Sequence, residues 1–267
     1  MKLAIVWAIF VVAAAGFGTS AGVPPQAETY PGVPEIVVKA ARNQGHSLYV
    51  RDRCRYEQRL LMERYKFDKR LQQQGELIAT RTTTVVVEPS SKADETGFIP
   101  VVTRVVADTN DKGEPKQSVD PNARTGLASG AFLDQVFFPI LPEKLAFLSF
   151  EEVESTAEGE RWFKFTPKAS LPTNLEWPLA SGVLQLDAKT GEVLTIRVSG
   201  FVNLKALDKQ LDKIRSFNAN VDYSQFGGAL RMPSTANGSG VSNVSRFDGY
   251  FKFIFEEGKY APVMKID

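Results

Sequence analysis

The chain offers few side chains suited to acid–base or metal chemistry. Among its 267 residues there is one histidine, His46, and one cysteine, Cys54. Catalysis of the Ser–His–Asp or Cys–His type would depend on His46, but no Gly-x-Ser-x-Gly nucleophile elbow accompanies it. Zinc favours His and Cys ligands, and two such residues cannot build a site. We therefore expect an exposed loop histidine and a buried thiol, with no catalytic residue, no metal site and no cofactor.

Acidic residues are the remaining candidates for chemistry. Residues 108–113, Asp-Thr-Asn-Asp-Lys-Gly, carry oxygen atoms suited to calcium but lack the downstream bidentate glutamate of an EF-hand loop. Glu151, Glu152 and Glu154 have the residue type that glycoside hydrolysis requires. Neighbouring side chains of a strand point to opposite faces, so these three glutamates are better explained as the solvated side of a hairpin. A secreted carboxylate-dependent hydrolase stays as a second alternative.

Arginines recur at every second position from Arg51 through Arg53 to Arg55. On a strand they would project from one face and could attract phosphate, lipid headgroups or a partner protein. Acidic residues interleave with them, which favours a solvated, salt-bridged face. The whole chain has 32 basic and 31 acidic residues, a net charge of +1, so it has no overall attraction for nucleic acid.

The N-terminus has the order of a secretory signal peptide. Lys2 precedes an apolar run over residues 3–16, and small residues follow up to Ala21. The run is shorter than the roughly 20 residues that a membrane-spanning helix needs. We predict cleavage after Ala21, so that 1–21 is a signal peptide and 22–33 a flexible leader. The mature protein would be soluble and exported, located in the periplasm or cell envelope if the host is bacterial and secreted otherwise.

The first half of the mature chain mixes helix and strand signals. Pro34 predicts a short helix over 35–42, ended by Gly45. Residues 77–88 are dense in Thr and Val and predict a strand that needs a partner across the turn at 74–76. The charged segment 55–71 fits a strand or a helix, and this missing partner favours the strand.

The remaining elements are predicted from apolar runs and turn residues. Residues 98–107 indicate a strand and 108–130 a long loop. Residues 131–148 are strongly apolar but broken by Pro139 and Pro142, which suits either a lid over a ligand or a plug of the core. Strands are then expected at 145–154, 161–166, 182–187, 192–199, 217–223, 228–232, 241–247 and 250–256, with 204–214 a short helix or a strand. This spacing predicts an antiparallel meander and a single domain over 34–267.

One hairpin of the second half resembles a known family. Residues 182–198 read Gly-Val-Leu-Gln-Leu-Asp, a turn, then Gly-Glu-Val-Leu-Thr-Ile-Arg-Val, and residues 162–167 read Trp-Phe-Lys-Phe-Thr-Pro. Both are similar to exported bacterial proteins of the lipoprotein-carrier (LolA-like) superfamily. The resemblance implies a mainly β (α+β) fold, with an antiparallel curved sheet that forms an incomplete barrel capped by a few short helices or loops. It also implies an acyl-chain or lipoprotein ligand, or an envelope protein partner.

These observations together predict an exported, non-catalytic cell-envelope protein that binds a hydrophobic or lipid-like ligand. The alternative is an envelope interaction or sensor protein without a small ligand. The candidate lining residues are Phe137, Phe138, Phe147, Trp162 and Phe165, and ordinary core packing is the alternative for each. Asn237 and Asn243 lie in glycosylation sequons that matter only if the host glycosylates.

Overall fold

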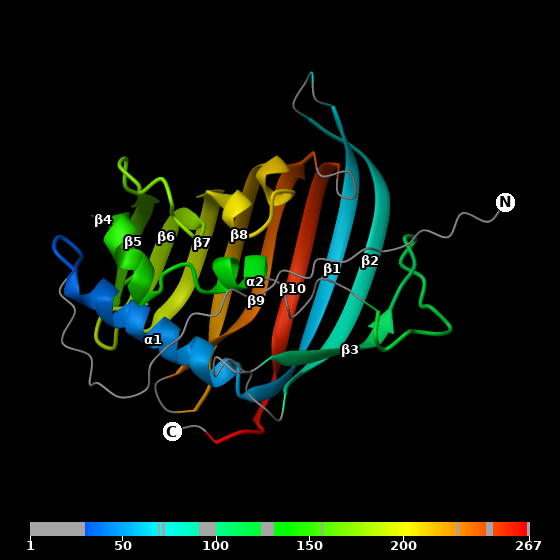
Figure 1. The fold of residues 1–267 in the computed structure, drawn as a ribbon, viewed down its shortest axis with the longest axis horizontal. Coiled ribbons are helices and arrows are strands. Elements are labelled where there is room, and N and C mark those ends of the chain that lie inside the picture. The colour runs from blue at the N-terminus through cyan, green and yellow to red at the C-terminus, as the bar shows by residue number, and fades with distance from the viewer. Residues whose placement is uncertain are drawn as a thin grey trace.

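Ten antiparallel strands form one sheet with a few short helices (Figure 1). This computed structural model describes residues 30–68, 70, 73–90, 100–123, 131–155, 157–227, 230–243 and 248–265, so the predicted signal peptide and most of the leader lie outside it. The strands are β1 Cys54–Asp68, β2 Gln73–Pro89, β3 Val101–Asp108, β4 Leu148–Val153, β5 Glu160–Pro167, β6 Leu179–Asp187, β7 Val193–Val202, β8 Ile214–Gln225, β9 Arg231–Ser242 and β10 Gly249–Pro262.

The sheet is open, with the order β3-β2-β1-β10-β9-β8-β7-β6-β5-β4. Within the described ranges its two edge strands, β3 and β4, do not pair with each other, so the predicted mainly β fold with an unclosed antiparallel sheet is confirmed. The first and last strands are neighbours in the middle, in a register that pairs Leu60 with Phe255 and Arg64 with Phe251. The strand assignment for 55–71 is confirmed over residues 55–68, because β1 pairs with both β2 and β10; residues 69 and 71 lie outside the described residues.

The first helix, α1, is longer than predicted and spans Glu35–Arg51. Gly45 does not end it, because α1 packs against η1 (Pro142–Phe147) at that point and a Cβ on Gly45 would lie 3.7 Å from Pro142. Tertiary packing thus offsets the roughly 1 kcal/mol that a glycine costs a helix. Two predictions are corrected in consequence: His46 is exposed but helical, and Arg51 ends α1 and belongs to no strand.

The proline-broken segment forms two short helices, α2 (Ala131–Phe137) and η1. Residues 204–214 form two 3-10 turns, η2 (Leu204–Ala206) and η3 (Leu211–Lys213), before β8 begins. Separate strands were predicted at 228–232 and 241–247, but Arg231–Ser242 is one strand, β9, that joins the described parts of both; residues 228, 229 and 244–247 lie outside the described residues. Gly238 and Gly240 fell between the two predicted strands, and they leave room for aromatic rings of β10.

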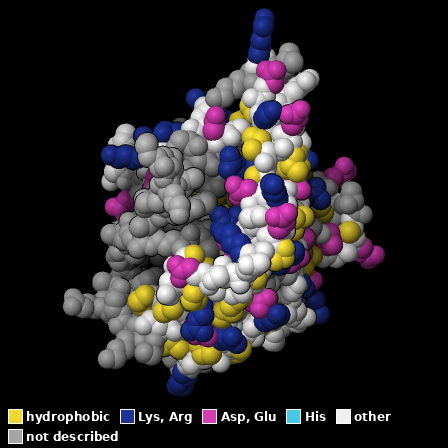
Figure 2. Space-filling view, turned by 90° about the vertical axis from the view of Figure 1, so that its right-hand side faces the viewer, with side chains coloured by type: hydrophobic (Ala, Val, Ile, Leu, Met, Phe, Trp, Pro, Cys, Tyr) yellow, Lys and Arg dark blue, Asp and Glu magenta, His cyan; other side chains and the backbone are white. Residues whose placement is uncertain are grey.

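All the helices that pack on the sheet cover one face, which we call the inner face. Phe163, Phe165 and Phe255 point to it, and α1, α2 and η1 lie against it (Figure 1). The opposite, outer face carries exposed ion pairs such as Arg55–Glu88 and Arg59–Glu256. Seen from the β2 side, basic and acidic side chains alternate without a patch of one sign (Figure 2). No helix among the described ranges combines the length and apolar character needed to cross a bilayer.

Candidate functional site

Three cross-strand rows of side chains define the part of the inner face next to β1. The first row joins Arg64 of β1 to Phe251 of β10, Gly240 of β9 and Phe217 of β8. The second joins Met62, Phe253, Gly238 and Ala219, and the third joins Leu60, Phe255, Ala236 and Val221. Residues paired across strands share a face, so these rows form one continuous apolar surface, and the first row ends at Arg64.

Five phenylalanines cross this surface in a line that we call the aromatic strip: Phe132, Phe201, Phe217, Phe251 and Phe253. Phe132 of α2 meets Phe217 edge-on at 5.2 Å between ring centroids, and Phe217 stacks on Phe253 at 5.7 Å. Phe132, Phe201 and Phe251 are only partly buried. The strip therefore starts under α2 and emerges toward β1 as a half-open aromatic surface.

Glycines on β9 make the strip possible. A Cβ at Gly238 would come within 2.8 Å of the Phe253 ring, and one at Gly240 within 2.6 Å of the Phe251 ring. Rings of one strand thus cover glycines of its neighbour, an arrangement that stabilises glycine-containing strands. The alternation Phe251-Lys-Phe253-Ile-Phe255 and the Gly-Ser-Gly of β9 are the two halves of this packing.

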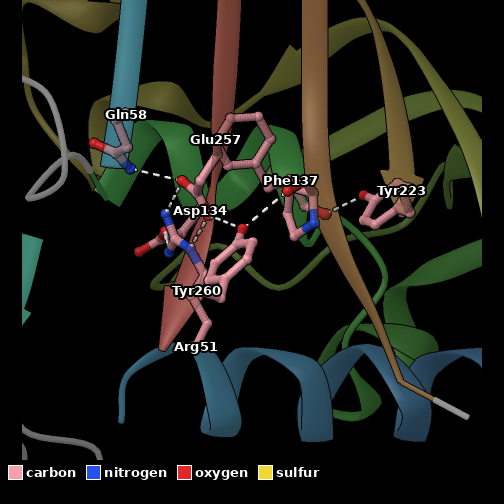
Figure 3. Close-up of polar contacts among 8 residues, drawn as sticks. Arg51, Gln58, Asp134, Phe137, Tyr223, Glu257 and Tyr260 are labelled. Carbon is pink, nitrogen blue, oxygen red and sulfur yellow. Dashed lines mark hydrogen bonds and ion pairs between the residues drawn. The ribbon is translucent and has the colours of Figure 1, made fainter. Parts of the chain in front are cut away.

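A buried polar cluster holds α2 against the sheet (Figure 3). Arg51, at the end of α1, donates from Nε and Nη2 to the two carboxylate oxygens of Glu257 at 2.6 and 2.8 Å. Its Nη1 donates to Asp134 of α2 at 3.0 Å. Gln58 and Tyr260 also donate to Glu257. One guanidinium therefore connects α1, α2 and β10.

A second set of contacts holds the end of α2. The backbone carbonyl of Phe137 accepts hydrogen bonds from the Tyr223 hydroxyl and from Gln44 Nε2, the latter at 3.4 Å (Figure 3). Lys144 of η1 donates to Gln135 at 2.5 Å and to the carbonyl of Phe138 at 3.4 Å. Because each partner lies on another element, the C-terminal half of α2 is fixed by polar contacts.

Burial dominates the electrostatics of this region. It raises the pKa of Asp134, although the Arg51 charge opposes the rise. It also raises the pKa of Asp52 to about 7, helped by the charge of Asp134. Desolvation lowers the pKa of Lys144 to about 8.

The five lining residues predicted from the sequence do not gather in one place. Phe137, Phe138 and Phe165 have no exposed surface and belong to the main core. Phe147 is partly buried and meets Trp177 edge-on at 6.0 Å. Trp162 alternates with Phe163 and lies on the outer face under Arg197. The inner face beneath α1 and α2 is thus filled with side chains, and its open part is the aromatic strip.

The acidic candidates have structural partners. Glu152 pairs with Arg161 on an exposed hairpin, while Glu151 and Glu154 are exposed. Asp108 accepts hydrogen bonds from Arg81, Lys116 and Thr83. In the portion of the chain that the structure covers, no three His, Cys, Asp or Glu side chains are grouped to hold a metal ion.

A hollow of about 370 Å³ opens on the outer face, between β8 and β1. Polar side chains such as Asn218, Asn237 and Ser239 line it together with Ile254. Phe253 and Gly238 also border it, but its polar lining does not match the acyl-chain site that the family resemblance implied.

Sequence reasoning missed the aromatic strip entirely. The alternating phenylalanines of β10 are apparent in the sequence, but their glycine partners on β9 fell between two predicted strands. Phe132 of α2 and Phe201 of β7 are more than 60 residues apart, and only the packing of α2 on the sheet brings them together.

No family model and no curated protein matches this chain. Among solved structures, a DUF1329 family protein from Desulfovibrio piger is similar at a TM-score of 0.35 and 9% identity, over 86% of this chain and 95% of that one. MucB, solved in complex with MucA(peri), is similar at a TM-score of 0.22 and 12% identity, over 84% of this chain and 100% of that one. These are weak fold similarities, and the functional argument below rests on the side chains.

Proposed function

We propose that this protein is an exported, non-catalytic cell-envelope protein that binds a hydrophobic or lipid-like ligand on its aromatic strip. The observation that carries the proposal is the partial exposure of Phe132, Phe201 and Phe251 on the inner face of the sheet. Aromatic side chains left half-covered on a concave apolar surface are a usual feature of small-molecule sites. Export is proposed from the apolar N-terminal run and the small residues before Ala21.

The energy of binding would come from the burial of apolar surface. Each buried methylene contributes about 0.8 kcal/mol, so a ten-carbon chain contributes on the order of 8 kcal/mol before the costs of association. Affinities in the micromolar to millimolar range follow. The partly buried Leu60 and Met62 extend the apolar surface beyond Phe253 and would lengthen the contact.

In this arrangement α2 forms one wall of the site. Phe132 packs on Phe217 and Phe201 from above the sheet, so a chain lying on the strip would end against it. Phe137, Phe138 and Phe165 form the packed layer behind that wall. Phe147 stays a prediction as a lining residue, whereas Trp162 projects from the outer face and lies outside the proposed site.

Titration with decanol, a neutral ten-carbon probe, tests the proposal by calorimetry. We expect saturable binding with one molecule per chain. Phe251→Ala and Phe132→Ala should each weaken it about tenfold, because each removes part of the contact surface. Trp162→Ala is the matched control, since it removes a large aromatic from the outer face and should leave the affinity unchanged. Failure of the folded wild-type protein to bind decanol would contradict the proposal.

Native mass spectrometry of protein isolated from the envelope of its host gives a second readout. The proposal predicts an added mass that is removed by organic extraction and is consistent with an acyl chain. The proposal would be wrong if the folded protein showed no added mass and also did not bind decanol.

A further inference from the structure

Arg64 is the cation at which the aromatic strip ends. It is paired across the strands with Phe251 on one side and with Ala79 on the other, so its side chain lies on the inner face. Two positions earlier on the same face of β1 is the apolar Met62. A basic side chain thus lies at the end of the row Phe217–Gly240–Phe251, where the neighbouring cross-strand partners are apolar.

The guanidinium of Arg64 has no partner among the residues that the structure describes. Its Nε is buried and, within the described part of the chain, donates to no acceptor. Five other arginines are paired with carboxylates: Arg51, Arg55, Arg59, Arg161 and Arg231. A buried donor without an acceptor is unfavourable, and more so on a charged group. Arg64 is therefore a site where an added anion would be stabilised.

The charged groups next to Arg64 either have a partner already or lie on the other face of the sheet. Arg81 lies on the same face, across from Met62, but its Nε and Nη2 donate to the two carboxylate oxygens of Asp108. Glu63, which precedes Arg64, lies on the outer face and accepts a hydrogen bond from the Tyr65 hydroxyl. No described carboxylate on the inner face neutralises Arg64.

We propose that Arg64 binds the anionic headgroup of an amphiphile whose apolar chain lies along the aromatic strip. This inference rests on the proposed function and narrows it to ligands with a carboxylate or a phosphate at one end. A guanidinium suits both, because its planar donors form paired hydrogen bonds with two oxygens of either group. The order along the site is α2, Phe217, Phe253, Phe251 and then Arg64.

Three probes of equal chain length distinguish the contribution of the headgroup to the affinity from that of the apolar chain. They are decanoate, decyl phosphate and decanol. Wild-type protein should bind the two anions at least tenfold more tightly than decanol. Arg64→Gln should abolish this preference, so that this variant binds the two anions and decanol with affinities within about twofold of one another. A ratio of the two anion affinities that favours decanoate identifies a fatty-acid carboxylate as the source, and the opposite ratio identifies a lipid phosphate.

Arg59→Gln is the matched control, because Arg59 lies on the same strand but projects from the outer face. It should keep the anion preference. Arg64→Lys retains the positive charge without the planar donors, so it should keep part of the preference for anions. Circular dichroism checks that each variant is folded.

The outcomes separate the two proposals. If decanol binds but Arg64→Gln retains the preference for anions, or wild-type shows no such preference, the role of Arg64 is wrong while the proposed function stands. If none of the three probes binds folded wild-type protein, the proposed function itself is wrong.

Discussion

Arg51 and Glu257 form a bidentate ion pair with almost no exposure to water. The Arg51 side chain exposes 2% of its surface and the Glu257 side chain none, and their contacts are 2.6 and 2.8 Å. The Arg51 guanidinium also lies 4.9 Å from the centroid of the Tyr56 ring. The pair joins the first helix to the last strand. Its two residues are 206 positions apart in sequence, so the pair connects distant parts of the chain.

Arg51→Met should be strongly destabilising. It leaves the Glu257 carboxylate buried without its cation, a change that costs about 3–5 kcal/mol in comparable cases. Urea unfolding followed by circular dichroism measures the loss. Arg51→Met combined with Glu257→Leu should recover part of it, because the double variant leaves no buried charge at position 257.

The exposed pair Arg59–Glu256 is the control for that experiment. Arg59→Gln should cost less than about 1 kcal/mol, because both side chains are about half exposed to solvent. An Arg51→Met protein no less stable than Arg59→Gln would show that the buried pair does not hold α1 to β10.

Asp134→Ala should loosen α2 while leaving the sheet intact. Asp134 exposes 36% of its side chain, and Arg51 keeps Glu257 when Asp134 is lost. Hydrogen bonds to charged groups contribute about 1.5–3 kcal/mol, so amide exchange in α2 should be at least tenfold faster. Exchange in β10 should not change. Glu143→Ala, an exposed acid on η1, is the control, and equal exchange in Asp134→Ala and wild type would contradict the anchoring role of Asp134.

The pH dependence of stability should be visible at Asp52. Burial and the nearby Asp134 raise its pKa from 3.8 to about 7 in the folded state, so folding is favoured while the carboxyl keeps its proton. This contribution is fully present below about pH 4 and is lost as the pH rises through 7. Asp52→Asn should therefore gain stability relative to wild type as the pH rises from 5 to 8. One pKa unit corresponds to about 1.4 kcal/mol, and about two units separate pH 5 from the folded-state pKa, so the gain is at most about 3 kcal/mol.

Urea unfolding at pH 5 and pH 8 measures this difference. Asp212→Asn, at an exposed turn position, should change stability equally at both values. If Asp52→Asn shows the same difference from wild type at pH 5 and pH 8, the Asp52 carboxyl is ionised throughout, and its burial does not control its charge.

The strands were predictable where a local pattern was strong enough. Thr and Val over 77–88 indicated a strand, and the need for a partner correctly assigned 55–71 as its neighbour. The first helix was predicted too short because Gly45 is a local signal, whereas its packing against Pro142 comes from a distant segment. Arg51 was consequently placed on a strand, and its role in the buried cluster could not be foreseen.

The candidate site was the least predictable part. Arg64 is one of 32 basic residues, and nothing in its neighbours along the chain distinguishes it. Its position beside Phe251 follows from the pairing of β1 with β10, a contact 187 positions away in sequence. Phe137 and Phe138 were chosen because their segment is apolar, but an apolar segment fills a core as readily as it lines a ligand site.

Gly240→Ala should destabilise the protein and distort the aromatic strip. An added Cβ would lie 2.6 Å from the Phe251 ring and 2.6 Å from the backbone oxygen of Ser216, and the latter cannot move without shifting β8. Overpacking of this kind costs about 1–3 kcal/mol. Gly258→Ala is the matched control on β10, since nothing lies within 4 Å of its Cβ position, and it should be neutral. Adding Phe251→Leu to Gly240→Ala should restore only part of the stability, because the ring is one of two obstacles. Thermal unfolding measures all three, and a neutral Gly240→Ala would show that Phe251 does not cover Gly240.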